Sequence, residues 1–330
     1  MKIVVLGSGS WGCALAQVLA DNEHDVKIWG INEAEVNDIN LNHQNSRYFE
    51  TTLHPKLKAY QDIKVIEDAD VLLLSIPSSA IEEVCLKINE HATKPAIIIN
   101  VAKGFHPLTH ERLSVVIDRS LSAKAKKAVV SLIGPSHAEE VILRLLTCVN
   151  AVSNDLEAAQ TVQSLFSNSY FRVYTNDDVI GAEIGVALKN IMALASGMLT
   201  GVGQGDNAKA ALMTRGLAEM TRYGTYFGGK AATYLGLDGV GDLIVTCTSL
   251  HSRNFQAGLE IGKTNNAKAF MENNTKTVEG IKACKIVYEE AQARNIDMPI
   301  TTEIYRILYE GKDCAQALSD LMNRTLKKEY

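Results

Sequence analysis

The chain lacks the cysteine patterns of disulfide-stabilised or zinc-binding proteins. Among its 330 residues, the six cysteines form no C-x-x-C pair and stand at no zinc-like spacing from a histidine. Neither a disulfide scaffold nor a metal site is therefore expected, and a reducing, cytoplasmic location is favoured. Positive charge is not in excess either. With 33 Lys and Arg against 38 Asp and Glu, the formal net charge is −5, so the whole chain offers no electrostatic surface for a nucleic-acid partner.

Uninterrupted apolar runs of the roughly 20 residues needed to span a membrane are also missing. The most apolar region, residues 184–199, contains Lys189 and Asn190. The first 20 residues imitate a signal peptide, but the three glycines among them point elsewhere. With 46% hydrophobic residues, the chain has material for a sizeable core, and its length favours about two domains. We expect no stable membrane association.

Proline is nearly absent from the second half, because five of the six prolines precede residue 136 and only Pro299 follows. In the first half, short apolar runs alternate with helix-like segments at residues 12–20, 79–91, 109–121 and about 155–166. This alternation is typical of strands buried on both faces of a parallel sheet. These runs are residues 3–6, 26–29, 71–76, 96–101, 129–133, 148–152 and 171–174. From Ile184 onward, apolar residues recur at three- and four-residue steps, the pattern of an amphipathic helix. The sequence therefore predicts an α/β protein. A Rossmann-like, doubly wound, mainly parallel dinucleotide-binding domain would span residues 1–178, and an all-helical substrate domain residues 179–330.

A glycine-rich segment directly follows the first predicted strand. Gly7, Gly9 and Gly12 form a G-x-G-x-x-G pattern that opens a helix rich in alanine and leucine. In this context the first glycine permits a tight turn, the second lets a pyrophosphate approach the backbone, and the third allows the helix to pack closely on the strand. The helix N-terminus would present N–H groups to the phosphates. A turn without a ligand is the alternative, and the strand before it and the helix after it argue against that.

The choice between NAD and NADP stays open. The acidic residue that grips the ribose 2′-hydroxyl is expected about 20 positions after the glycines, but the second strand ends in WGINE at residues 29–33. Glu33 comes one turn late and is more typical of a solvated carboxylate at a helix start. No Arg or Lys stands there to bind a 2′-phosphate.

Lys103 is the most informative residue among the loops that follow the later strands. These loops, residues 75–78, 102–104 and 134–137, should line the same crevice as the glycines. A lysine at this place, followed by Gly104, suits a cofactor or an anionic substrate. An ordinary surface lysine is the alternative.

Lys189 and Asn190 are too polar for the apolar helix that contains them. Burying a lysine costs several kcal/mol unless it is paired or deprotonated. Burial and nearby positive charge lower the pKa of a lysine toward the range of a general acid–base, which makes Lys189 a candidate proton-transfer group. A snorkelling lysine is the alternative. Asp242 is a plausible partner, although an aspartate at this position also suits a helix cap.

Two further features of the helical half bear on function. Arg253, between Ser252 and Asn254, could bind a phosphate through its planar guanidinium, or it could be an exposed ion-pairing arginine. Cys247 has no histidine nearby in the sequence, so we interpret it as a buried structural thiol and not a nucleophile.

Together these motifs resemble the bacterial-type NAD(P)-dependent glycerol-3-phosphate dehydrogenase family. The resemblance is carried, in order, by GSGSWG at 7–12, SIPS at 75–78, KGF at 103–105, GPSHAEE at 134–140, GAEIGVALKN at 181–190, GDNAKAALMTRGLAEM at 205–220, GVGDLIVTCTSLHSRN at 239–254, TVEG at 277–280 and MPIT at 298–301. It implies reversible reduction of dihydroxyacetone phosphate to sn-glycerol 3-phosphate with NAD(P)H, for glycerophospholipid synthesis. It also implies a cytoplasmic homodimer.

The resemblance further implies a role for each matching residue. Lys189 would donate the proton in reduction, and Asn190, Asp242 and Thr246 would complete the catalytic centre. Substrate contacts would come from Lys103, Gly134, Ser136, Lys189, Asp242, Ser252, Arg253 and Asn254. Cofactor contacts would come from Gly7, Gly9, Ser10, Trp11, Gly12, Lys103, Ala138, Arg253 and Glu279.

Departures from the family pattern are few, and none removes a group that the chemistry needs. His137 stands where phenylalanine is common, and Ala102 where threonine is frequent. Two other functions are kept as alternatives. One is a β-hydroxyacid or ketopantoate-type dehydrogenase, whose substrate carries a carboxylate in place of the phosphate. The other is a catalytically silent nucleotide-sensing protein.

Overall fold

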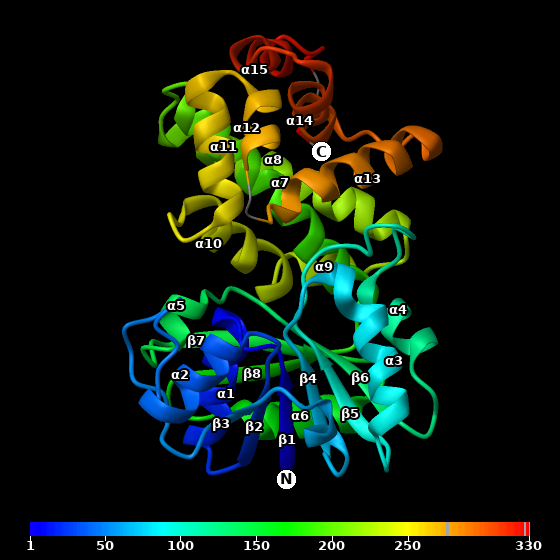
Figure 1. Cartoon of the computed structure of the whole chain (residues 1–330). Helices are drawn as coiled ribbons and strands as arrows, with labels where there is room; N and C mark the ends of the chain where they lie inside the picture. Colours follow the sequence, from blue (N-terminus) through cyan, green and yellow to red (C-terminus); the bar gives the residue numbers. More distant parts are fainter. Residues whose placement is uncertain (275–276, 327, 330) are drawn as a thin grey trace. The chain divides into compact units, whose positions relative to one another are not determined.

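The computed structural model describes every residue except 275–276, 327 and 330, and it divides into two compact units. We call Met1–Glu183 the sheet unit and Ile184–Tyr330 the helical unit. The sheet unit holds eight strands (Figure 1). They are β1 (Lys2–Leu6), β2 (Asp25–Trp29), β3 (Lys58–Tyr60), β4 (Val71–Leu74), β5 (Ala96–Asn100), β6 (Lys126–Ile133), β7 (Thr147–Val152) and β8 (Phe171–Asn176).

The strand order is β3-β2-β1-β4-β5-β6-β7-β8, and only the β6–β7 pair is antiparallel. The chain runs outward from β1 to β3 and then returns to place β4 on the other side of β1. This reversal creates a topological switch point between β1 and β4, the place where open sheets of this class bind ligands. The predicted mainly parallel, doubly wound architecture is confirmed.

Helices cover both faces of the sheet (Figure 1). They are α1 (Ser10–Asp21), α2 (Glu33–Asn42), α3 (Ile81–His91), α4 (Leu113–Ser120), α5 (Ala138–Val141) and α6 (Leu156–Phe166). In the central strands, alternate residues enter different cores: Ile3 and Val5 belong to a core with residues of α1, α2 and α6, whereas Val4 and Leu6 belong to one with residues of α3 and α4. This two-sided burial explains why the central strands read as continuous apolar runs.

The sequence pattern did not anticipate β3 or α2, and it placed the start of α4 too early. Helix α2 carries few apolar residues, and its N-terminus is fixed by the Asn32 side chain, which accepts the backbone N–H groups of Ala34 and Glu35. Helix α4 begins at Leu113, not at the expected residue 109. Residues 105–112 instead form a loop closed by a β-bridge between Phe105 and Arg112, which keeps this stretch from becoming helical.

The helical unit is built around α7 (Val179–Gly201), whose first turn belongs to the sheet unit. The other helices are α8 (Asp206–Tyr226), α9 (Ala231–Tyr234), the π-helical turn η3 (Leu237–Gly241), α10 (Asp242–Thr248), α11 (Arg253–Thr264), α12 (Ala267–Asn273), α13 (Glu279–Arg294), α14 (Pro299–Glu310) and α15 (Cys314–Met322). By length and composition α7 could cross a membrane. However, 89% of its apolar window is buried inside the protein, as in the core helix of a globular fold.

Helices α7 and α11 contact each other backbone to backbone. A Cβ on Gly197 would overlap the carbonyl oxygen of Phe255, and a Cβ on Gly258 would overlap that of Leu194. Small residues on both helices therefore permit an approach that a larger side chain would prevent.

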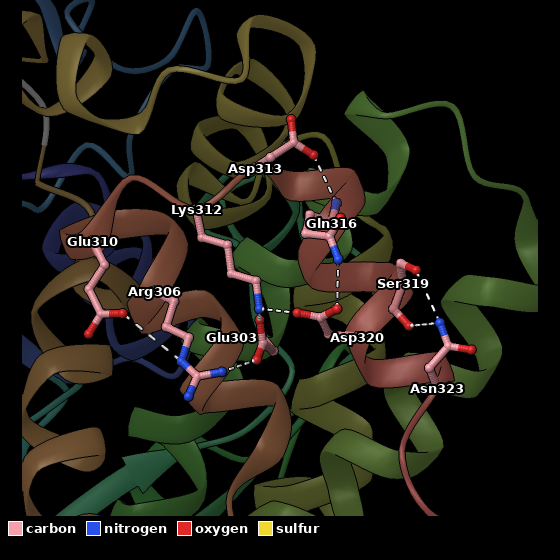
Figure 2. Close-up of polar contacts among 9 residues, drawn as sticks. All are labelled: Glu303, Arg306, Glu310, Lys312, Asp313, Gln316, Ser319, Asp320 and Asn323. Carbon is pink, nitrogen blue, oxygen red and sulfur yellow. Dashed lines mark hydrogen bonds and ion pairs between the residues drawn. The ribbon is translucent and has the colours of Figure 1, made fainter.

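Helices α14 and α15 are joined by a polar network (Figure 2). Glu303 accepts a hydrogen bond from Arg306 at 2.7 Å and also pairs with Lys312, which reaches Asp320 at 2.5 Å. The side chain of Asp313 caps α15 by accepting the backbone N–H of Gln316. The charged C-terminal segment is attached by two ion pairs: Arg324 lies 3.2 Å from the Asp297 carboxylate, and Glu329 lies 3.6 Å from Arg215. Residues 327 and 330 lie outside the described part.

Candidate active site

The glycine loop between β1 and α1 has the geometry of a dinucleotide-binding turn. Gly7 has φ +122°, and a Cβ there would overlap the carbonyl oxygen of Ser75 at the end of β4. A Cβ on Gly12 would overlap the carbonyl oxygen of Gly7, so this glycine lets α1 pack directly on the loop. At Gly9, by contrast, a Cβ would meet nothing within 4 Å. Open space over the middle glycine is what an approaching pyrophosphate requires.

The start of α1 also fits a negatively charged ligand. No side chain caps this helix, and its first turn holds no acidic residue. Ser10 and Trp11 lie in that turn, and the indole N–H of Trp11 is buried without a hydrogen-bond partner among the described residues. Uncapped N–H groups at a helix N-terminus favour phosphate. The residues present therefore fit the nicotinamide dinucleotide that the motif implies.

The remaining predicted residues of the sheet unit lie in loops at strand ends. Lys103 follows β5 and is half-buried. Gly134, with φ +150°, follows β6, and a Cβ there would lie 2.9 Å from the Cα of Val149. The Ser136 hydroxyl donates to the Gly134 carbonyl at 3.0 Å, and Ala138 begins α5. These loops lie at the carboxyl ends of parallel strands, on the same sheet edge as the glycine loop.

Lys189 is buried in the helical unit and held by two oxygen-bearing side chains. Its side chain is 3% exposed, and its Nζ donates to Asp242 Oδ1 and, at 2.9 Å, to Thr246 Oγ1. The Thr246 hydroxyl donates in turn to the Asp242 carbonyl at 2.6 Å. Because Asp242 is itself 1% exposed, the structure places a complete ion pair in the protein interior. Asp242 does not cap α10, since the N-cap is Gly241.

A second polar cluster surrounds Asn190. The Asn254 amide donates to Asn190 Oδ1 at 3.0 Å, while its own oxygen accepts the backbone N–H of Gly280 at 2.8 Å. The Ser252 hydroxyl caps α11 by accepting the N–H of Phe255. These contacts bring the starts of α11 and α13 to the middle of α7.

Two charged residues flank this second cluster. Arg253 is exposed at the first position of α11, and Glu279 is the first residue of α13. Burial raises the pKa of Glu279, and the charges of Lys282 and Arg253 partly oppose that rise. The helical unit thus gathers seven predicted residues into two adjoining clusters: Lys189, Asn190, Asp242, Thr246, Ser252, Arg253 and Asn254.

Other buried groups of the helical unit have surroundings that are less suited to catalysis. Burial raises the pKa of the Cys247 thiol to about 12, which disfavours the thiolate. Burial also raises the pKa of Glu219 to about 7, although its carboxylate accepts the backbone N–H groups of Ile300 and Thr301. Glu219 lines an apolar cavity of about 780 Å³ between α7, α8, α14 and α15, and none of the predicted site residues lines it.

Sequence reasoning missed two carboxylates of the sheet unit. Glu183, in the first turns of α7, accepts the hydroxyls of Ser114 and Ser131 at 2.7 and 2.9 Å and ties the helix to the sheet. Glu35 accepts the hydroxyl of Ser8 in the glycine loop and pairs with Arg47. Glu35 lies outside every motif named above, and Glu183, although it stands in the segment GAEIGVALKN at 181–190, was given no role there; in both cases the available signal was a carboxylate within a partly apolar helical pattern.

The fold and these residues define a dehydrogenase of the two-unit, nicotinamide-dependent class. Residues 2–159 match the N-terminal domain of the NAD-dependent glycerol-3-phosphate dehydrogenase family, and residues 178–319 match its C-terminal domain. The chain belongs to this family, and it is an NAD(P)-dependent oxidoreductase.

Individual relatives agree with this assignment. A glycerol-3-phosphate dehydrogenase [NAD(P)+] of Listeria innocua is 49% identical over 330 residues, covering 99% of this chain and 98% of the relative. The crystal structure of glycerol-3-phosphate dehydrogenase from Coxiella burnetii is 36% identical with a TM-score of 0.90, and the match covers 98% of this chain and 99% of that one. A ketopantoate reductase from Ralstonia eutropha, at 15% identity and a TM-score of 0.60 over 96% of this chain and all of that one, shares the fold alone.

Proposed function

We propose that the enzyme reversibly reduces dihydroxyacetone phosphate to sn-glycerol 3-phosphate, with Lys189 as the group that moves the proton. The observation that carries this proposal is the buried cluster of Lys189, Asp242 and Thr246. A lysine in this setting is too costly to serve packing alone. Nucleotide binding is assigned to residues 1–178 and substrate chemistry to residues 179–330.

Bound NAD(P)H supplies the hydride that reaches C2 of the ketone. Negative charge then develops on the C2 oxygen, and Lys189 Nζ neutralises it by donating a proton. Asp242 provides the counter-charge that keeps an ammonium group stable in the interior. Thr246, which accepts from Nζ and donates to the Asp242 carbonyl, fixes the direction of the lysine side chain. In the oxidative direction the same amine accepts the proton.

The substrate phosphate is assigned to Arg253, with Ser252 and Asn254 beside it. Arginine suits this task because its planar guanidinium can make two parallel hydrogen bonds to a phosphate. Binding the phosphate away from the reacting carbon positions C2 without taking part in bond making. Lys103, Gly134 and Ser136 are assigned further substrate contacts, and Asn190 orients the reacting centre through its bond with Asn254.

The glycine loop, Ser10, Trp11, Lys103, Ala138, Arg253 and Glu279 are assigned to the cofactor. Open space over Gly9 and the uncapped start of α1 support this assignment. The family resemblance further supports a homodimer in the cytoplasm that supplies the glycerol phosphate backbone of phospholipids. The burial of α7 supports an enzyme without stable membrane association. Light scattering coupled to size-exclusion chromatography measures the molar mass and so checks the homodimer.

The first experiment follows the loss of reduced-nicotinamide absorbance after dihydroxyacetone phosphate is added to the purified enzyme. NADH and NADPH are tested in parallel, and ketopantoate serves as the control substrate. We expect turnover with the phosphate substrate and none with ketopantoate. Turnover with ketopantoate alone would assign the chain to the carboxylate-bearing substrates, and nucleotide binding without any turnover would favour a sensor.

A further inference from the structure

The end of β2 carries no charge with which to recognise the adenosine ribose. In sheets of this class, an acidic residue here binds the ribose 2′-hydroxyl, whereas a nearby arginine binds the 2′-phosphate of NADP. A Cβ on Gly30 would lie 2.5 Å from the Ser8 hydroxyl oxygen, so Ser8 fills the space of a side chain. Ile31 is apolar and 79% exposed, and the Asn32 side chain is occupied in capping α2.

Two charged residues beside the glycine loop come from elsewhere in the chain: Glu35 from α2 and Arg47 from the loop that follows α2. Glu35 is 7% exposed, and its Oε2 accepts the hydroxyl of Ser8 at 2.6 Å. Its Oε1 accepts Arg47 Nη1 at 2.9 Å and the Tyr48 hydroxyl at 3.3 Å. A single carboxylate therefore connects the glycine loop to Arg47.

Asn45 holds the loop that carries Arg47 against the glycine loop. It is buried, and its side-chain amide donates to the Ser8 carbonyl at 2.7 Å. Arg47 itself has a side chain 62% exposed, so its guanidinium faces solvent on one side and Glu35 on the other. The charge of Arg47, beside the glycine loop, is thus compensated by the buried carboxylate of Glu35.

We propose that Glu35 makes this enzyme prefer NADH over NADPH by pairing with Arg47 beside the glycine loop. The inference rests on the proposed binding of NAD(P)H at that loop. A 2′-phosphate arriving here would meet the negative charges of Glu35 and the exposed Glu33, and it would compete with Glu35 for Arg47. The neutral 2′-hydroxyl of NADH meets no such repulsion. The preference for NADH therefore arises because the site repels NADPH.

The test compares kcat/KM for NADH and NADPH in the wild type, Glu35→Gln, Arg47→Ala and the double variant. We expect the wild type to favour NADH at least about tenfold. Glu35→Gln removes the carboxylate that pairs with Arg47 and leaves the arginine available to a 2′-phosphate. The ratio of kcat/KM for NADPH to that for NADH should then rise about tenfold, because one charge-assisted hydrogen bond to a phosphate changes affinity by about that factor. The double variant should lose this gain, and added salt should weaken it.

Glu33→Gln is the matched control, because it removes a nearby negative charge without releasing Arg47. It should shift the ratio much less than Glu35→Gln. Structural damage at Glu35 would lower both kcat/KM values together, so it cannot produce the expected rise in their ratio. A wild type that favours NADPH, an unchanged ratio in Glu35→Gln, or a gain that persists without Arg47 would overturn the proposal. Titration of protein fluorescence with each nucleotide gives the same preference without turnover, so it distinguishes this failure from failure of the proposed reaction.

Discussion

The glycine loop and the Lys189 cluster are built from different parts of the chain. At the loop, the binding surface consists of backbone atoms, and its shape depends on positions without side chains. There is open space for a ligand over Gly9, whereas neighbouring backbone atoms leave no space for a Cβ on Gly7 or Gly12. At Lys189, the working surface consists of side chains that would be unstable in the interior without one another. A backbone site is specified by a short local pattern, whereas a side-chain site needs residues from distant segments.

The strongest test of this contrast is Lys189→Ala, which should lower kcat about 10³-fold because proton transfer to the C2 oxygen is lost. Nucleotide affinity, measured by titration of protein fluorescence, should change little. Since alanine leaves Asp242 buried without its partner cation, Lys189→Arg is made in parallel. Arginine keeps the charge but does not give up a proton, so the same loss is expected. Turnover near the wild-type level in either variant would remove Lys189 from its role.

A second test asks whether burial of a charged group is by itself a sign of catalysis. The pKa of Glu219 is about 7 in the folded chain, above the ordinary value of 4.5. Its contribution to stability is therefore complete below about pH 4.5 and is lost as the pH rises through 7. Glu219→Gln should remove about 2 to 3 kcal/mol of pH dependence between pH 5 and pH 8. Urea unfolding at both pH values measures this, and kcat should not fall.

The smallest expected effect separates the glycines of the loop. Gly9→Ala adds a methyl group to open space, so the melting temperature should stay constant while the KM for the nucleotide rises about tenfold. Gly12→Ala forces Cβ against the Gly7 carbonyl, and a melting temperature lower by roughly 5 °C is expected. Thermal unfolding measures the melting temperature of both variants, and steady-state kinetics measures their KM for the nucleotide. Equal effects in the two variants would contradict the division of roles.

Local patterns were sufficient to predict the architecture of the sheet unit. The central strands are buried on both faces and read as apolar runs, whereas the short β3, the polar α2 and the four-residue α5 were not predicted. The residues of the Lys189 cluster were named through polarity in an apolar context and through family resemblance. Their contacts could not be predicted, because Lys189 and Asp242 stand 53 residues apart and meet only through helix packing. Glu35 was missed for the same reason: its partners Ser8 and Arg47 lie 27 and 12 residues away.

The glycine contact between α7 and α11 has a consequence for how this enzyme tolerates change. Helix α7 carries Lys189 and Asn190, and α11 begins with Arg253 and Asn254. Because Gly197 and Gly258 bring the two helices into direct contact, backbone atoms and not side chains set the distance between these functional groups. One added methyl group at either glycine would therefore act as a spacer between the two helices. Such a substitution would push α7 and α11 apart, and it would disturb the spacing of the functional groups and lower the stability of the unit together.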